Sequence, residues 1–386
     1  MPESLIPYIN IGPGEFIREE LEIHNWSQED FAKILGMSLK SVNKIIMNKQ
    51  AITVETARLL SKVFGQSPQY WLALDNNYRL RSQQDDARAK EVEIKAKIYK
   101  YMPIKEMIKN KWLRVYKNIK DLEKQIKQFW EIKILDFSFL EEFSLPPLRK
   151  SSAFANYNKY YALTWFHMAK KCASLYSVAH YNTQKLQSVA HSISNYTIRD
   201  NGVEQFINDL NQAGVKFFVL NHLPKTYIDG ASFFNNDNPV IVYTQRYNRI
   251  DNFWFTVAHE LAHIKLHLKK KEDFFLDNIE DLNEGEEQEA DQYAANLIKV
   301  NQIREFFKPY GNYISEQRVN YCAQELAESP AIIVGVLQHY GTLSPRNLNR
   351  LKEYISKYIP DYFYAENHLK EIYYIKTENH NNKKIR

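Results

Sequence analysis

The distribution of glycine constrains the fold of this chain more than any other feature of its sequence. None of the 11 glycines lies between Gly65 and Gly202, where average usage of about 7% would place roughly nine. Because glycine supplies the positive-φ conformations that tight turns need, a long stretch without it favours helices. Breaks in these helices are expected at the prolines of the stretch, Pro68, Pro103, Pro146 and Pro147.

The sequence after Gly202 changes character and predicts a small sheet. Three short runs rich in β-branched and aromatic residues are bounded by turn residues, a pattern typical of strands. These runs are VKFFVL at 215–220, ASFF at 231–234 and PVIVYT at 239–244. Helical periodicity returns from Asp251, with a polar, acidic loop near residues 272–286. The predicted fold class is mainly α: an all-α N-terminal domain, a helical connector and a C-terminal α+β domain with a small antiparallel sheet.

Length and composition indicate the number of domains and the compartment. At roughly 150 residues per domain, a chain of 386 residues predicts two or three domains, which we place at 1–80, 81–200 and 201–375. The two cysteines cannot form a disulfide framework, so we expect a reducing compartment, the cytoplasm. The chain has neither the pattern of a signal peptide nor a run of eighteen apolar residues. We therefore expect neither secretion nor a membrane partner.

Two short helices joined by a tight turn are predicted near the N-terminus. Ser27 and Asp30 have the spacing of a capping box, Gly36 ends the helix that they begin, and Ser38 caps the next helix. This pattern is a helix-turn-helix, which reads DNA by placing its second helix in the major groove. Residues 31–54 contain four lysines and no acidic residue, which favours contact with phosphates. The candidate DNA-binding residues are Gln28, Ser38, Lys40, Ser41, Asn43, Lys44 and Lys49. A helical domain that binds protein is the alternative, and the pattern alone leaves the two readings nearly even.

The clearest chemical motif is the sequence HELAH at residues 259–263. On a helix, His259 and His263 are one turn apart on one face, so their imidazole nitrogens can bind one Zn²⁺ at about 2.0 Å. Glu260 lies beside them and is placed to activate a water molecule as general base. Asp251 is a plausible N-cap for this helix. His267 continues the spacing, but a helix from residue 259 to 267 spans about 12 Å, too far for all three histidines to bind one metal ion.

An acidic segment offers the third ligand. Residues 251–300 contain 12 acidic and 5 basic side chains. Glu287 and Asp291 are four residues apart, so on a helix Glu287 can bind the metal while Asp291 holds the second nitrogen of a ligating histidine. Glu286 and Glu289 are alternative ligands. The alternative is that no metal site exists, and that an exposed acidic helix simply lies near an ordinary helix that carries two histidines.

The N-terminal residues resemble a known family. The stretch GEFIREELEIHNWSQEDFAKILGMSLKSVNKIIMNKQAITVETARLLSKVFGQSPQYWLAL is similar to the XRE-type domain of HigA-like antitoxins. The resemblance implies a homodimer that binds double-stranded operator DNA and represses its own promoter. Leu39 and Lys44 depart from the residues usual in that family, so the operator sequence does not transfer. Asn48 stands where the family commonly has glycine, and asparagine also tolerates the left-handed conformation.

The C-terminal residues resemble the ImmA/IrrE metallopeptidase domain. The segments GVKFFVL, DGASFF, NPVIVYT, RIDNFWFTVAHELAHIKLH and EADQYAANLI occur in that family's order. The resemblance implies that Zn²⁺ binds His259, His263 and Glu287, that Glu260 is the general base, and that Asp291 orients a ligand. It also implies helix-turn-helix repressors as targets, so the substrate is this chain, a partner repressor or a companion toxin.

The predicted function is a DNA-binding regulator of antitoxin type that carries a zinc endopeptidase of the gluzincin type. One alternative is a DNA-binding antitoxin without hydrolysis, whose peptidase-like domain is a sensing or protein-binding scaffold. Another is a peptidase whose N-terminal domain binds only protein. His339 is a candidate transition-state donor, although a lone histidine is more often simply packed. Residues 81–90 and the loop at Pro146 and Pro147 are the candidate sites of self-cleavage.

Overall fold

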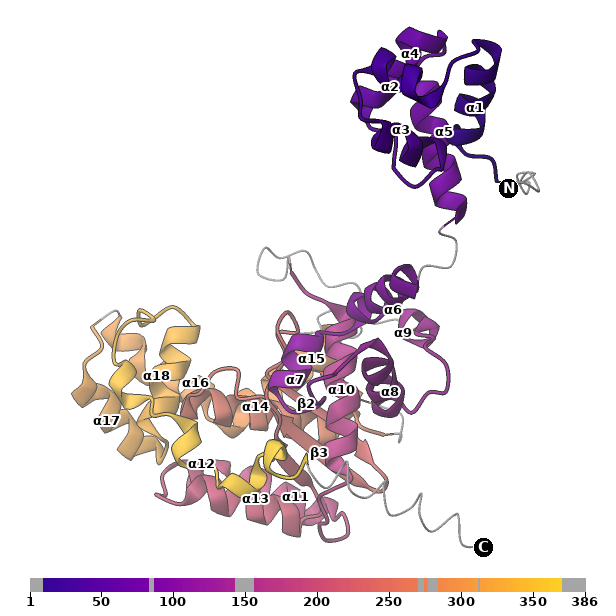
Figure 1. Ribbon diagram of the computed structural model, residues 1–386. Coiled ribbons are helices and arrows are strands. Elements are labelled where there is room, and N and C mark those ends of the chain that lie inside the picture. The colour runs from indigo at the N-terminus through magenta and orange to yellow at the C-terminus, as the bar shows by residue number, and fades with distance from the viewer. Residues whose placement is uncertain are drawn as a thin grey trace, which may run out of the picture. The chain divides into compact units, whose positions relative to one another are not determined.

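The computed structural model describes residues 10–82, 87–142, 156–269, 274–276, 284–311 and 313–369. The chain forms two compact units, residues 1–94 and 95–386 (Figure 1). The division into three domains at 1–80, 81–200 and 201–375 stays a prediction.

The first unit is a bundle of five helices followed by the start of a sixth (Figure 1). The helices are α1 (Pro13–Ile23), α2 (Gln28–Leu35), α3 (Leu39–Ile46), α4 (Val54–Phe64), α5 (Pro68–Ser82) and α6 (Ala87–Tyr101). The core of the bundle includes Ile17, Phe31, Val42, Leu60 and Trp71, each at most 1% exposed. This core holds α2 and α3 against α1, α4 and α5.

Helix ends in this unit match the signals in the sequence. Ser27 and Asp30 form a complete capping box at the start of α2. Gly36 ends α2 with a φ of 62°, in the left-handed region that glycine adopts without steric cost. The Ser38 hydroxyl accepts the backbone N–H of Ser41 at 3.2 Å and so caps α3. The predicted helix-turn-helix is confirmed, and Asn48 has the left-handed φ, 57°, that was expected there.

The second unit is mainly helical. Its helices before the sheet are α7 (Ile104–Lys109), α8 (Ile119–Trp130), α9 (Ser138–Glu142), α10 (Lys159–Ala173), α11 (Thr183–His191), α12 (Ile193–Thr197) and α13 (Gly202–Gln212). After the third strand come α14 (Ile250–Ala262), α15 (Glu284–Leu297), α16 (Val300–Phe307), α17 (Glu316–Leu326) and α18 (Pro330–His339). A single π-helical turn, His263–His267, continues α14, and short 3₁₀ turns follow α16 and α18. The helical reading of the glycine-poor stretch is therefore correct, although Pro146 and Pro147 lie outside the described residues.

The sheet is mixed, which corrects the expectation of a purely antiparallel sheet. Among the described residues it has four strands in the order β1-β3-β2-β4. β2 (Gly230–Asn235) is antiparallel to β3 (Asn238–Tyr243) and β4 (Phe274–Leu276), whereas β1 (Lys216–Val219) is parallel to β3. The connection at residues 220–229 explains the difference. It spans the end of the sheet and leaves room for β3 between β1 and β2, so β3 runs in the direction of β1.

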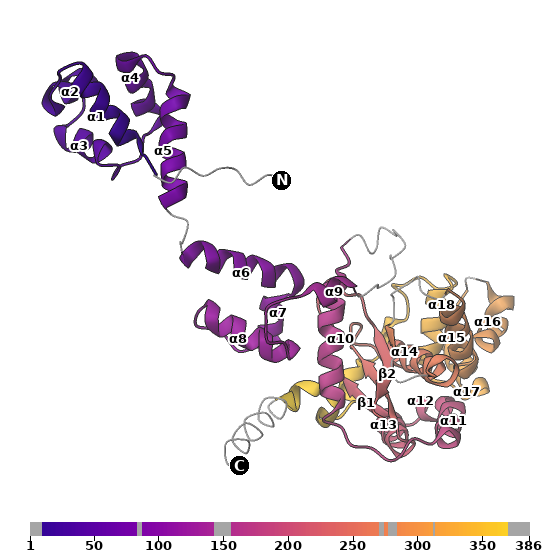
Figure 2. The ribbon, with the colours of Figure 1, turned by 90° about the vertical axis from the view of Figure 1, so that its right-hand side faces the viewer.

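Helices cover both faces of this sheet. Alternate residues of β1 and β3, among them Phe217 and Tyr243, join the core that includes Phe253 and Trp254 of α14. On the other face, Phe166 of α10 packs edge-on against Phe233 of β2, with ring centroids 5.2 Å apart. Figure 2 shows α10 and α14 on opposite sides of the strands. α14 is consequently a rigid, buried helix, and it is the helix that carries the HELAH motif.

Candidate functional site

Helix α14 begins at Ile250, two residues earlier than an N-cap at Asp251 would place it. Its N-cap is Arg249, and Asp251 lies inside the first turn. The proposed role of Asp251 as N-cap is therefore wrong. Its side chain, 3% exposed, instead forms an ion pair with Lys352 at 2.8 Å. Lys352 is distant in sequence, so this pairing anchors the start of α14 to the C-terminal part of the unit.

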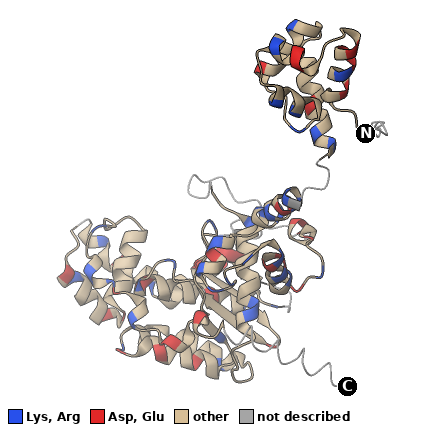
Figure 3. Cartoon of the chain, viewed as in Figure 1, with Lys and Arg blue, Asp and Glu red and all other residues tan. Residues whose placement is uncertain are grey.

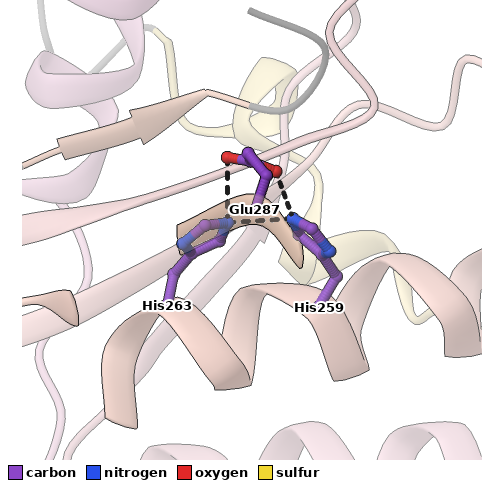
Figure 4. A group of neighbouring side chains, drawn as sticks. All are labelled: His259, His263 and Glu287. Atoms are coloured by element: carbon purple, nitrogen blue, oxygen red, sulfur yellow. Dashed lines mark hydrogen bonds and ion pairs between the residues drawn. The ribbon is translucent and has the colours of Figure 1, made fainter. Parts of the chain in front are cut away.

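Two histidines and one glutamate converge at the C-terminal end of α14. His259 and His263 point from the helix toward Glu287 of α15 (Figure 4). Their Nε2 atoms are 2.9 Å apart. Glu287 Oε2 lies 3.1 Å from Nε2 of His259, and Oε1 lies 3.4 Å from Nε2 of His263. Among the described residues, these three are the group of potential ligands whose donor atoms lie within 4.8 Å of one another.

The donor atoms fit a zinc ion. Tetrahedral zinc at about 2.0 Å from each ligand atom holds those atoms about 3.3 Å apart. The two Nε2 atoms are 2.9 Å apart, and each lies 3.1 or 3.4 Å from the Glu287 oxygen that it faces, Oε2 for His259 and Oε1 for His263. Two imidazole nitrogens and one carboxylate are a ligand set that leaves a fourth position open, as catalytic zinc sites require. The residues present therefore suit a catalytic zinc ion.

Electrostatics favour an ionised Glu287. Burial raises the pKa of this carboxyl, but hydrogen bonds and charge interactions with His259 and His263 together outweigh that effect and hold the pKa at about 2. In the metal-free site these contacts are made by Nε2 of each histidine, the atoms that a bound metal ion would take instead. A carboxylate that is already charged needs no deprotonation before it binds a cation.

The structure assigns contacts to the other predicted residues of this region. Asp291 Oδ1 accepts Nδ1–H of His259 at 2.9 Å, the arrangement expected for a carboxylate that orients a ligand. Glu260 follows His259 directly and is completely buried. The alternative ligands Glu286 and Glu289 are not members of the group of three. Glu289 instead lies 3.2 Å from Nε2 of His267, a contact that sequence reasoning missed.

A cleft of about 610 Å³ opens beside the three ligands. His259 and Glu287 line it together with residues of α15 and α18. His263 is completely buried, whereas the side chain of Glu287 is 34% exposed. His339 also lines the cleft. Its role as a transition-state donor stays a prediction.

In the first unit, α3 presents a polar face with no acidic residue (Figure 3). Lys40, Asn43 and Lys44 are exposed on it, and Ser38 and Lys49 are exposed beside its two ends. Ser41 is half-buried, and its hydroxyl lies 2.9 Å from that of Ser38. Leu39 is 43% exposed at the start of α3, and Met47 is 54% exposed immediately after it.

Comparisons with known proteins match both units. The model of the Helix-turn-helix family matches residues 17–71, and that of the IrrE N-terminal-like domain, a peptidase-type family, matches residues 182–335. The HTH-type transcriptional regulator YddM of Escherichia coli is 38% identical over 68 residues, which cover 18% of this chain and 72% of that protein. Virulence-associated protein I of Dichelobacter nodosus is 35% identical over 80 residues, 20% of this chain and 74% of its own length.

Two solved structures are also similar. One is an addiction module antidote protein of the HigA family from Coxiella burnetii, with 32% identity, a TM-score of 0.20, and coverage of 22% of this chain and 92% of that one. The other is the antitoxin HigA of Pseudomonas aeruginosa with the higBA promoter, with 31% identity and the same TM-score and coverage.

No helix in the described part of the chain combines the length and apolar character needed to cross a membrane.

Proposed function

Because this chain belongs to the HTH-type transcriptional regulators and carries an IrrE N-terminal-like domain, we propose that it is a regulator of antitoxin type with a zinc-dependent endopeptidase in its second unit. The observation that carries the proposal is the convergence of His259, His263 and Glu287 within 4.8 Å. Two imidazoles from α14 and its π-helical turn and one carboxylate from α15 come together here beside a cleft.

The chemistry follows from the residues around these ligands. When bound, zinc supplies a Lewis acid that activates water toward a peptide carbonyl. The Glu260 carboxylate takes the proton of the attacking water and delivers it to the leaving amine. Asp291 keeps the proton of His259 on Nδ1, so Nε2 presents its lone pair to the metal. The adjoining cleft, about 610 Å³, has room for an extended peptide segment.

For the first unit, we propose that α3 enters the major groove of operator DNA. The exposed side chains Lys40, Asn43 and Lys44 would face base edges and phosphates. Gln28, Ser38, Ser41 and Lys49 complete the proposed contact surface. Two copies of the chain would bind as a homodimer to the two halves of a palindromic operator.

The peptidase test compares the wild type with Glu260→Gln, in which an NH₂ group replaces one oxygen of the carboxylate. Wild-type protein and Glu260→Gln are loaded with zinc and incubated alone, with operator DNA, with candidate repressors and with the product of any adjacent toxin gene. Mass spectrometry then maps the fragments. Fragments that appear only with the wild type support a peptidase and identify its substrate as this chain, a repressor or a toxin.

The alternative is a DNA-binding antitoxin whose second unit senses a ligand or binds a protein without hydrolysis. Identical fragments from both proteins, or no fragments from either, would favour it. Identical fragments would also exclude self-cleavage by this site at residues 81–90 or near Pro146 and Pro147. These two segments lie partly or wholly outside the described residues.

A further inference from the structure

His267 is a buried histidine that the proposed reaction does not use. It ends the π-helical turn His263–His267, which continues α14. Its side chain is 4% exposed, while that of its partner Glu289 is 67% exposed. A π-turn within a helix interrupts the regular hydrogen bonding and is frequent at functional sites.

Hydrogen bonds connect His267 to a proposed zinc ligand. Its Nδ1 lies 3.1 Å from Nδ1 of His263. Its Nε2 lies 3.2 Å from Oε2 of Glu289. The chain of contacts therefore runs from the exposed carboxylate of Glu289 through His267 to the completely buried ring of His263.

The direction of these hydrogen bonds, from donor to acceptor, follows from the chemistry of the groups. An ionised carboxylate only accepts hydrogen bonds, so the Glu289 contact places the proton of neutral His267 on Nε2. Nδ1 of His267 is then an acceptor, and Nδ1 of His263 must donate to it. When Nε2 of His263 binds a metal ion, the ring proton must lie on Nδ1, and the contact with His267 holds it there. Without metal, Glu287 also faces Nε2 of His263 at 3.4 Å and competes for the same proton.

The two ligating histidines are thus oriented in different ways. His259 donates directly to Asp291 at 2.9 Å. His263 has the intervening ring of His267 between it and a carboxylate. Phe275 of β4 stacks on His263 with centroids 4.3 Å apart and planes 15° apart. Stacking limits the tilt of the ring, but it does not determine which nitrogen carries the proton.

We propose that His267 and Glu289 are positioning residues that fix the tautomer of His263 so that its Nε2 can bind metal. This inference rests on the proposed zinc site. Loss of such outer hydrogen bonds typically weakens metal binding about 10- to 100-fold, and we expect a loss of that size when the acceptor for His263 is removed.

Two substitutions of His267 separate hydrogen bonding from packing. Leucine fills the space without an acceptor, so His267→Leu should weaken zinc binding about 10- to 100-fold. The Oδ1 atom of asparagine occupies roughly the position of histidine Nδ1, so His267→Asn should restore an affinity close to that of the wild type. Zinc affinity is measured on the full chain by competition with a chelating indicator.

A substitution of Glu289 tests the same hydrogen bonds by reversing the roles of donor and acceptor. In Glu289→Lys a donor replaces the acceptor, which should place the His267 proton on Nδ1 and that of His263 on Nε2. Glu289→Gln can still accept and should behave as the wild type. The same competition assay measures the zinc affinity of both variants, without any measurement of activity: Glu289→Lys should bind zinc more weakly than the wild type, and Glu289→Gln should not.

The outcomes distinguish this inference from the proposal on which it rests. If the wild type binds no zinc, the metal site itself is wrong. If the wild type binds zinc and His267→Leu binds it equally well, or if asparagine fails to restore binding, the positioning role is wrong and the metal site stands. An unchanged zinc affinity in Glu289→Lys would also overturn the positioning role.

Discussion

The side-chain amide of Asn43 donates a hydrogen bond to the side-chain carbonyl of Gln28, 3.2 Å away. Asn43 is exposed on α3, and Gln28 is the first residue of α2. The contact therefore joins the two helices of the helix-turn-helix on their polar side. It also holds the Asn43 amide in one orientation, and amides of asparagine and glutamine are the side chains that pair with adenine in the major groove.

The first prediction concerns sequence recognition. Asn43→Ala should relax the preference for operator over unrelated DNA by about 1–3 kcal/mol at the base pair that it contacts. Lys49→Ala is the matched control, and it should weaken binding to all sequences. It should also reduce the slope of the logarithm of the binding constant against the logarithm of salt concentration by about 1, because one phosphate contact is lost. Fluorescence anisotropy with the upstream promoter, over a series of salt concentrations, measures both. If neither change affects binding to the promoter, the proposed contact surface is wrong, which favours the alternative in which the first unit binds protein.

The second prediction concerns metal content. The purified protein should hold close to one zinc ion, and His263→Ala should lose it, because one of three protein ligands is gone. Glu260→Gln should retain the metal, since that residue handles the water proton rather than the ion. Elemental analysis after dialysis measures the content. Zinc retained in full by His263→Ala would rule out the proposed ligands.

Local signals in the sequence predicted the first unit well. Ser27, Gly36 and Ser38 determine where α2 and α3 begin and end through contacts within a few residues, and such contacts are visible in sequence. The histidine pair was equally visible, because helical spacing alone places His259 and His263 on one face.

Contacts between distant segments were less accessible. β4 spans only Phe274–Leu276, inside a segment that was predicted to be a polar loop, and its pairing with β2 cannot be deduced from so short a run. His267 was recognised as too distant to be a ligand. Its contact with Glu289 depends on how α14 packs against α15, which helical spacing does not specify.

The third prediction tests the buried ion pair at the start of α14. Lys352→Met should destabilise the second unit by about 3 kcal/mol, because it removes the cation 2.8 Å from the buried Asp251 carboxylate. The remaining cation, Arg249, lies 3.3 Å from Asp251 with a side chain 45% exposed to water, so it compensates only in part. Urea denaturation measures the difference.

The double variant Asp251→Asn, Lys352→Met provides the control for this pair. It removes both charges and should recover most of the lost stability, since no buried ion remains unpaired. A double variant as unstable as Lys352→Met alone would mean that packing of the lysine stem, rather than charge, causes the loss.

The last prediction concerns acid sensitivity of the second unit. His167 of α10 stacks on Trp130 with centroids 4.4 Å apart, and its Nε2–H donates to the carbonyl of Phe129 at 2.7 Å. Burial lowers the pKa of His167 to about 4, against the smaller opposing effect of this hydrogen bond, and the charge of Lys171 lowers it further. The folded protein therefore keeps His167 neutral at pH values where the unfolded chain, with an ordinary histidine pKa near 6.5, binds a proton.

Stability should consequently fall as the pH drops from about 6.5 toward 4. Over this window the unfolded state binds the additional proton, and the difference amounts to about 2 kcal/mol at pH 5 and about 3 kcal/mol below pH 4. His167→Gln keeps a donor for the Phe129 carbonyl but cannot titrate, so its stability should decline about 2 kcal/mol less than that of the wild type between pH 7.5 and pH 5. Urea denaturation followed by tryptophan fluorescence at the two pH values measures this, with the exposed His191→Gln as control. If the wild type and His167→Gln lose the same stability, another group causes the acid sensitivity and His167 titrates normally in the folded protein.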